Sequence, residues 1–198
     1  MRNYLAEKVR QLRPGGRLLI RDVVGPENRD LSVSLWCSDG DGRDLAAQEL
    51  AEHQGREADW LRGLCTSNRF RLFTKDFLGG RRPFPFTEAV QEGQTIFRLA
   101  LWQAAEFLSK RDYADNWASE MNEEFCFWSF SQWKKALSEA GFRIVENADQ
   151  PDRGSRSYVN SWIVEHRYNG CVNLLGADGT ALNWPPSNMV IVAEKPLA

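Results

Sequence analysis

The sequence is poor in cysteine and histidine, the residues that build disulfide frameworks and most zinc sites. Its four cysteines lie far apart in the chain: Cys37, Cys65, Cys126 and Cys171. No C-x-x-C pair occurs, and neither His53 nor His166 flanks a cysteine at the spacing of zinc ligands. We therefore predict reduced thiols, as in a cytoplasmic protein, and no metal site.

Long apolar runs and a surplus of one charge are also missing. No apolar stretch approaches the roughly 20 residues that a membrane-spanning helix needs, and the charged start of the chain is unlike a signal peptide. The chain has 25 basic and 27 acidic residues, which gives a formal net charge of −2. This balance argues against a generally basic nucleic-acid binder. We expect neither a membrane nor a nucleic acid as the partner.

The chain contains no glycine-rich loop between a strand and a helix, the place where backbone N–H groups converge on a phosphate. Gly15-Gly16 precedes a predicted strand, and Gly40-Asp41-Gly42 follows no long apolar run. Gly79-Gly80 leads into two arginines and a proline. No cofactor-binding residue can therefore be assigned.

The acidic segment 38–44 has the composition of a calcium loop but the wrong register. If Gly42 takes the sixth position of such a loop, Cys37 and Gln48 occupy the first and twelfth positions. Asp and Glu are required at those two positions. We therefore interpret the segment as a turn that caps the next helix.

Close to its start the chain carries a predicted helix followed by a predicted strand. Leu5, Val9 and Leu12 fall on one face of a helix. Pro14 and the two glycines after it end that helix. The apolar residues of segment 18–24 make a run that is too short for a helix. We predict a strand buried on both faces, as in a parallel sheet.

A second helix and two further strands are predicted in the last third of the chain. Ser131 is placed to cap the helix and Gly141 to end it. The apolar face of this helix comprises Trp133, Ala136, Leu137 and Ala140. Strands are predicted over Phe142–Val145 and Met189–Lys195.

These elements resemble parts of one enzyme family. The first helix, the Leu-x-Pro-Gly-Gly turn at residues 12–16, the strand and Asp22 resemble the passage into the fifth strand of class I S-adenosylmethionine-dependent methyltransferases. Residues 129–142 resemble the last helix of that family and its exit into the sixth strand. Met189–Lys195 would be the seventh strand, which is antiparallel in this family. The resemblance covers residues 1–28, 125–150 and 188–196.

The resemblance implies an α/β fold, namely the C-terminal half of a Rossmann-like sheet (strands five to seven) with a large helical insertion and a small β excursion. The corresponding segments are residues 1–28, 29–124 and 125–198. The first four strands and the cofactor loop would precede Met1. The intact parent would bind S-adenosylmethionine and methylate a small molecule, whereas this fragment alone would be inactive.

The insertion is predicted to be mostly helical. Its helices are expected over Asp44–Glu52, Glu57–Asn68 and Thr87–Lys110. It would serve as a substrate cap above the carboxyl ends of the strands, or as a packing or dimer-forming appendage. The β excursion is predicted from the extended segments Tyr158–Glu165 and Cys171–Leu175, and from a hairpin signal at Asp178-Gly179.

Asp22 and His166 are the candidate catalytic bases. Methyl transfer mainly requires alignment of the nucleophile, and a base helps when the nucleophile carries a proton. Asp22 ends the predicted fifth strand, although it could instead cap the following turn. His166 follows Glu165, which could tune it, although a single histidine is more often structural.

Four further residues are candidate substrate contacts: Arg21, Phe127, Trp128 and Tyr168. Arg21 could bind an anionic substrate or could simply be solvated. Phe127 and Trp128 belong to an aromatic cluster that could stack a planar or cationic substrate, or could pack as core between the insertion and the sheet. Tyr168 lies two residues after His166.

Two alternatives to a small-molecule methyltransferase stay open. The chain could be a non-enzymatic interaction module built on a degenerate half-fold. It could also methylate RNA through the basic region between Arg62 and Arg82. The uncovered edge of the first strand predicts a homodimer or pairing with the missing N-terminal half. The coding sequence upstream of Met1 would discriminate the enzyme from the module.

Overall fold

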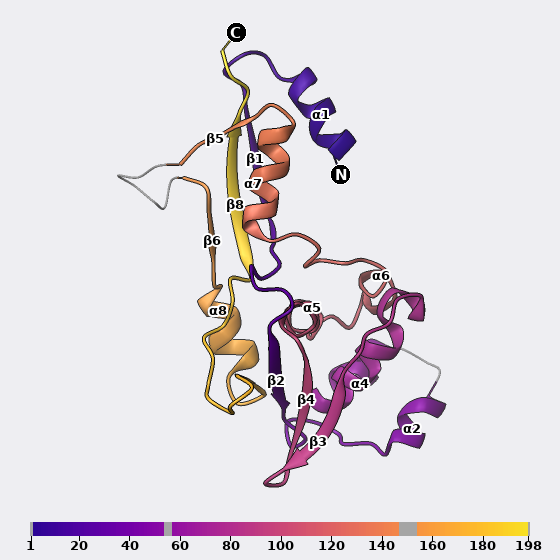
Figure 1. Ribbon diagram of the computed structural model, residues 1–198. Coiled ribbons are helices and arrows are strands. Elements are labelled where there is room, and N and C mark those ends of the chain that lie inside the picture. The colour runs from indigo at the N-terminus through magenta and orange to yellow at the C-terminus, as the bar shows by residue number, and fades with distance from the viewer. Residues whose placement is uncertain (1, 54–56, 147–153, 198) are drawn as a thin grey trace. The chain divides into compact units, whose positions relative to one another are not determined.

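The computed structural model describes residues 2–53, 57–146 and 154–197. The chain divides into two compact units (Figure 1). The first comprises Met1–Glu27, Cys126–Asn160 and Pro185–Ala198, and the second comprises Asn28–Phe125 and Ser161–Trp184. Each unit contains one four-stranded sheet, and every strand pairing in the described residues is antiparallel. The fold mixes helices and strands, as predicted, whereas the predicted Rossmann-like parallel sheet is not seen in the described residues.

The sheet of the first unit joins segments from near both ends of the chain. β1 (Arg17–Val23) and β8 (Asn188–Glu194) pair along their full length. β5 (Arg143–Ile144) and β6 (Arg156–Tyr158) also pair with β8. β8 therefore lies between β1 and β5 and is antiparallel to both. The three predicted strands are confirmed as strands, although β5 is shorter than expected.

One face of this sheet packs on two helices, α1 (Arg2–Gln11) and α7 (Phe130–Glu139). Leu5 of α1 and Leu137 of α7 share a core with Ile191 of β8. Ile20 of β1 is partly buried against this core, whereas Leu19 points to the other face and is 67% exposed. The prediction that β1 is buried on both faces is therefore wrong, because an apolar run does not reveal whether a second layer covers it.

Helix α7 begins two residues before the predicted position. Ser129, and not Ser131, is the N-cap: its side chain accepts a hydrogen bond from the Gln132 N–H (3.3 Å). The Gln132 side chain accepts in turn from the Ser129 N–H (2.9 Å), which completes a capping box. The predicted end of the helix is confirmed, since Gly141 has a φ of +99°.

The second unit orders its strands β3-β4-β2-β7. These strands are β2 (Ser32–Cys37), β3 (Thr87–Gln91), β4 (Gln94–Ala100) and β7 (Val172–Leu175). The helical elements are α2 (Ala47–Glu52), α3 (Ala58–Arg62), α4 (Thr66–Asp76), η1 (Phe77–Gly80), α5 (Leu101–Lys110), α6 (Trp117–Glu120), α8 (Ser161–Ile163) and the π-helical turn η3 (Val164–Tyr168). In the described residues, every helix is too short or too polar to cross a lipid bilayer.

The predicted helical insertion contains the strands β2, β3 and β4, which corrects the prediction. The helix expected over Thr87–Lys110 exists only as α5. Glu92 and Gly93, with φ of 53° and 76°, form a two-residue hairpin turn between β3 and β4. Phe97 and Leu99 point into the core with the two-residue period of a strand. The apolar residues around them are also spaced as on one face of a helix. The alternation typical of a strand could therefore not be recognised in the sequence.

The predicted β excursion is confirmed in one part and wrong in another. Cys171–Leu175 contains β7, and Gly179 turns the chain with a φ of +81°. Within Tyr158–Glu165, however, Tyr158 alone belongs to a strand, and the chain is helical from Ser161 onward. β7 pairs with β2, so the excursion completes the sheet of the second unit.

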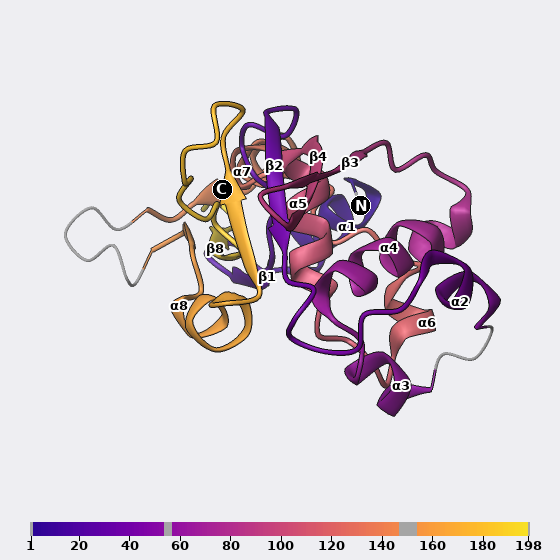
Figure 2. The same cartoon turned by 90° about the horizontal axis from the view of Figure 1, so that it is seen from below.

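The two faces of the second sheet differ. On one face, Phe97 of β4 stacks on Phe70 of α4 with ring centroids 4.1 Å apart, and Phe107 of α5 meets Phe70 edge-on at 5.0 Å. Figure 2 shows α4 and α5 beside β2 and β4. Leu35 of β2 completes this aromatic core. Trp36, the next residue along β2, projects to the opposite face.

Candidate functional site

The end of β1 carries two of the predicted site residues, Arg21 and Asp22. Both side chains are exposed. The Asp22 carboxylate accepts a hydrogen bond from the N–H of Val23 (2.8 Å). This contact is made to the next residue of the same strand, and the other carboxylate oxygen accepts no hydrogen bond from the described residues.

Glu27 provides a second carboxylate after β1, at the N-terminus of α7. It accepts hydrogen bonds from the Ser129 hydroxyl (2.8 Å) and from the Ser131 N–H (2.9 Å). Burial alone would raise the pKa of Glu27, but these hydrogen bonds outweigh burial and lower it below its usual value. Sequence reasoning missed Glu27 because its partners lie about a hundred positions away. The glutamate is therefore held ionised where the helix dipole favours negative charge.

Phe127, Trp128 and Trp133 form an aromatic cluster beside these residues. Their ring centroids lie 5.1 to 5.7 Å apart. The Gly25 N–H donates to the Trp128 carbonyl (2.9 Å), which ties the cluster to the segment after β1. Phe127 and Trp128 are half-buried and pack against the core of the first unit. They therefore contribute to that core and still present part of their rings to solvent.

His166 and Tyr168 belong to the second unit, whereas Asp22 belongs to the first. The His166 ring stacks on Trp162 with centroids 4.8 Å apart, and its Nδ1 lies 2.9 Å from the Trp162 carbonyl oxygen. Tyr168 is buried, and its hydroxyl donates to the Leu108 carbonyl (2.9 Å). Tyr168 thus serves the core of its unit, and His166 lies on an exposed turn.

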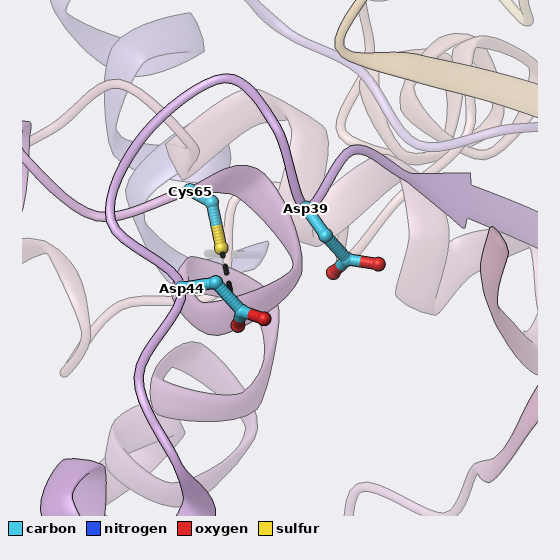
Figure 3. Close-up of side chains that lie close together, drawn as sticks. All are labelled: Asp39, Asp44 and Cys65. Atoms are coloured by element: carbon cyan, nitrogen blue, oxygen red, sulfur yellow. Dashed lines mark hydrogen bonds between the residues drawn. The ribbon is translucent and has the colours of Figure 1, made fainter. Parts of the chain in front are cut away.

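A group of possible metal ligands lies at the end of β2, where Asp39, Asp44 and Cys65 bring one oxygen or sulfur each to within 4.8 Å of one another (Figure 3). Asp39 and Asp44 come from the loop after β2, and Cys65 immediately precedes α4. The Asp39 carboxylate accepts from the Thr95 hydroxyl (2.8 Å) through one oxygen. Its other oxygen is buried and has no hydrogen-bond partner among the described residues.

The surroundings of this group oppose a bound cation. Asp44 accepts from the Asn68 amide (3.1 Å), and an Arg71 nitrogen lies 4.0 Å from the same oxygen. Burial raises the pKa of the Cys65 thiol, which favours the protonated form that does not ligate metal. The sequence analysis rejected a calcium site in this loop. It could not predict that Cys65 lies nearby, because the cysteine belongs to a distant segment of the chain.

A neighbouring aspartate on the same loop, Asp41, has a structural role. It accepts hydrogen bonds from the Thr66 N–H (2.8 Å) and the Thr66 hydroxyl (2.5 Å) at the start of α4. Arg111 lies 3.3 Å from the same carboxylate. Burial would raise the pKa of Asp41, but the hydrogen bonds from Thr66 outweigh it and lower the pKa. Asp41 thereby joins the loop to α4 and to the end of α5.

No protein-family model, curated protein or solved structure matches the chain. The strand order of the first unit and the placement of its polar and aromatic side chains are therefore the grounds on which a function can be assigned.

Proposed function

We propose that this chain is the carboxyl-terminal part of an S-adenosylmethionine-dependent methyltransferase that acts on a small molecule. One observation carries the proposal. β8, which resembles the antiparallel seventh strand of that family, pairs over its full length with β1, which resembles the fifth. β8 also pairs with β5, which resembles the sixth strand. Three segments that are distant in sequence thus meet with the relative direction that the resemblance requires.

The residues of this chain do not fit a complete cofactor site. The Gly15 N–H donates to the Lys195 carbonyl and the Gly16 N–H to the Arg13 carbonyl, each at 2.8 Å. The Gly40 N–H donates to the Ser38 hydroxyl (3.1 Å). These glycine amides are used within the chain and are not directed at a ligand. On this proposal, the contacts to S-adenosylmethionine come from residues that precede Met1.

This chain would supply the substrate side of the site. Methyl transfer needs the acceptor held in line with the methyl group, and water excluded. Phe127 and Trp128 offer half-exposed rings on which a planar acceptor can stack. Asp22 lies at the end of β1 with one carboxylate oxygen free to take a proton from a hydroxyl or ammonium acceptor. Arg21, the preceding residue of β1, projects to the opposite face of the sheet and is not part of this substrate side.

Binding of S-adenosylmethionine tests the proposal. We expect the coding sequence upstream of Met1 to contain a strand, a Gly-x-Gly loop and a helix. The extended protein should bind S-adenosylmethionine with micromolar affinity in isothermal titration calorimetry, whereas the 198-residue chain should give no heat. Submicromolar binding by the 198-residue chain, or an upstream sequence without that unit, would contradict the proposal.

A non-enzymatic interaction module is the second candidate, and one observation favours it. Leu19 on β1 is 67% exposed, and β1 pairs with β8 alone among the described strands. An open edge with an exposed leucine favours pairing with another chain. A homodimer or pairing with an upstream segment would satisfy this edge, and the two differ in whether the chain self-associates.

The RNA alternative has no comparable support. Arg62 pairs with Asp59 and Asp115, and Arg82 pairs with Glu124. Between them in sequence, Arg71 binds Glu88. Much of the charge of the basic region is thus neutralised within the second unit and is not presented as a phosphate-binding surface.

A further inference from the structure

The outer face of the second sheet, opposite α4 and α5, carries a set of aligned side chains. Residues that pair directly across antiparallel strands project to the same face. The strand register places two rows on this face: Arg98, Ser34 and Leu175 in one, and Ile96, Trp36 and Asn173 in the next. These rows cross β4, β2 and β7, so side chains from three strands form one floor.

Two loops rise at the sides of this floor and make it a groove. The β3–β4 hairpin closes with the pair Gln91 and Gln94, and the loop 176–179 follows β7 on the other side. Two cavities of about 330 and 210 Å³ lie over the floor. Gln94 and Leu175 line both cavities, which therefore adjoin along the face of the sheet.

The polar lining suits a neutral ligand. The side chains of Gln91, Gln94 and Asn173 make no hydrogen bond to other side chains or backbone in the part of the chain that the structure describes. Each amide offers both donors and an acceptor, as a hydroxyl group requires. Arg98 contributes one positive charge, and two carboxylates, Glu92 of the β3–β4 hairpin and Asp178 of the loop after β7, lie one on each side of the groove. This mixture gives no strong field of one sign for a phosphate or a cation.

Two tryptophans complete the second cavity. Trp36 lies on the floor between β4 and β7, and Trp184 lies at the rim, with its ring 5.2 Å from that of Tyr168. Both tryptophans are half-buried. An indole joins an apolar face to an N–H donor, which suits a ring that has C–H groups on its faces and hydroxyl groups at its edge.

We propose that this groove binds a neutral saccharide. The amides would hydrogen-bond the hydroxyl groups, and the indoles would stack on the faces of the sugar rings. An apolar ligand would leave the amides unpaired, which is costly on desolvation. The proposal is independent of methyl transfer, because every residue that carries it belongs to the second unit.

Spectroscopy of the tryptophan indoles tests the proposal. The probes are maltohexaose, cellohexaose and mannohexaose, each added to the ¹⁵N-labelled full chain at about 5 mM, which detects millimolar binding. At least one probe should shift the indole N–H signals of Trp36 and Trp184 and leave that of Trp162, which is 54% exposed on α8, in place. Substitution of each tryptophan identifies its signal.

The variant Gln94→Ala should weaken the binding about tenfold, because Gln94 lines both cavities. Gln94 is exposed, so its loss should leave the rest of the spectrum unchanged. Gln48→Ala, an exposed glutamine of α2, is the matched control and should bind as the wild type. Silence of all three probes, undiminished binding by Gln94→Ala, or a response to a sulfated hexasaccharide alone would each overturn the proposal.

Discussion

Lys110 and Glu106 form a fully buried ion pair in the second unit, with Nζ 2.8 Å from the carboxylate. Glu106 also accepts from the Phe125 N–H through both oxygens, and Lys110 donates to the Glu123 carbonyl. The Phe77 and Phe125 rings lie 4.9 and 4.4 Å from Nζ. These hydrogen bonds join segment 123–125 to α5. The two buried charges thus find their partners within the protein and not in solvent.

Loss of one member of this pair should be severe. We expect Lys110→Met to lower the free energy of unfolding by about 3–5 kcal/mol, because it leaves the Glu106 charge buried and unpaired. Urea denaturation followed by tryptophan fluorescence measures the change. Lys135→Met, which removes an exposed pair with Glu139 on α7, should cost less than about 0.5 kcal/mol. Equal losses in the two variants would contradict the prediction.

Asp41 should make the stability of the second unit decrease as the pH falls. Its pKa is lowered on folding, so its contribution is present above the unfolded pKa of about 4 and is lost as the pH falls through the folded value. Asp41→Asn should therefore cost about 1–2 kcal/mol at pH 7 and progressively less below pH 4. Urea midpoints across this pH range test the sign. Asp59→Asn is the control, because the Asp59 side chain is 98% exposed. It should change neither the free energy of unfolding at pH 7 nor the pH dependence of that free energy.

Helix α7 allows a comparison between the predicted and the observed start of an element. Ser129→Ala should destabilise the first unit by about 1–2 kcal/mol, because Ser129 caps the helix and also donates to Glu27. Ser131→Ala should cost less than half as much, since the Ser131 backbone N–H still reaches Glu27. Thermal and urea denaturation of both variants measures the difference. A larger loss in Ser131→Ala would favour the start that the sequence predicts.

The elements that could be predicted are those whose ends are marked locally. Pro14, Gly15-Gly16 and Gly141 fix the ends of α1 and α7, and β1 and β8 are apolar runs too short for helices. β4 could not be predicted, because its register with β2 and β3 decides its conformation and its apolar residues also fit a helical spacing. The turn at Glu92 could not be predicted either, because glutamate rarely adopts the positive φ that it has in this turn.

The candidate sites were harder to predict than the elements that carry them. Asp39, Asp44 and Cys65 meet through folding of separate segments, and no spacing in the sequence joins them. The groove on the second sheet depends on β7, which the sequence assigns to a separate excursion and the structure assigns to the sheet of the insertion. Membership of a sheet is a long-range property, so periodicity within one segment cannot reveal it.

At the scale of the whole molecule, the chain leaves the first unit and returns to it. The sequence predicts segments 1–28, 29–124 and 125–198, and the compact units change after residues 27, 125, 160 and 184. The structure also assigns Ser161–Trp184 to the second unit. Both units are thus built from segments that are not contiguous, and neither sheet is complete until distant parts of the chain have been made.

The open edge of β1 predicts how the isolated chain associates. Leu19 is 67% exposed and β1 pairs with β8 alone among the described strands, so a second copy should pair with the free edge and form a dimer. Leu19→Lys should abolish the dimer, because a charge on an edge strand disfavours pairing. Light scattering after size-exclusion chromatography at about 100 µM would detect dimers of micromolar affinity.

Val90→Lys is the matched control for this edge. Val90 is 73% exposed on β3, the edge strand of the second sheet, so the substitution adds the same charge to a similarly exposed edge position. We expect it to leave the dimer intact, because Val90 is the one large apolar residue of β3, whereas Leu19 lies between Leu18 and Ile20. A monomeric wild type, or a dimer that Val90→Lys disrupts and Leu19→Lys does not, would show that the edge of β1 is not the contact.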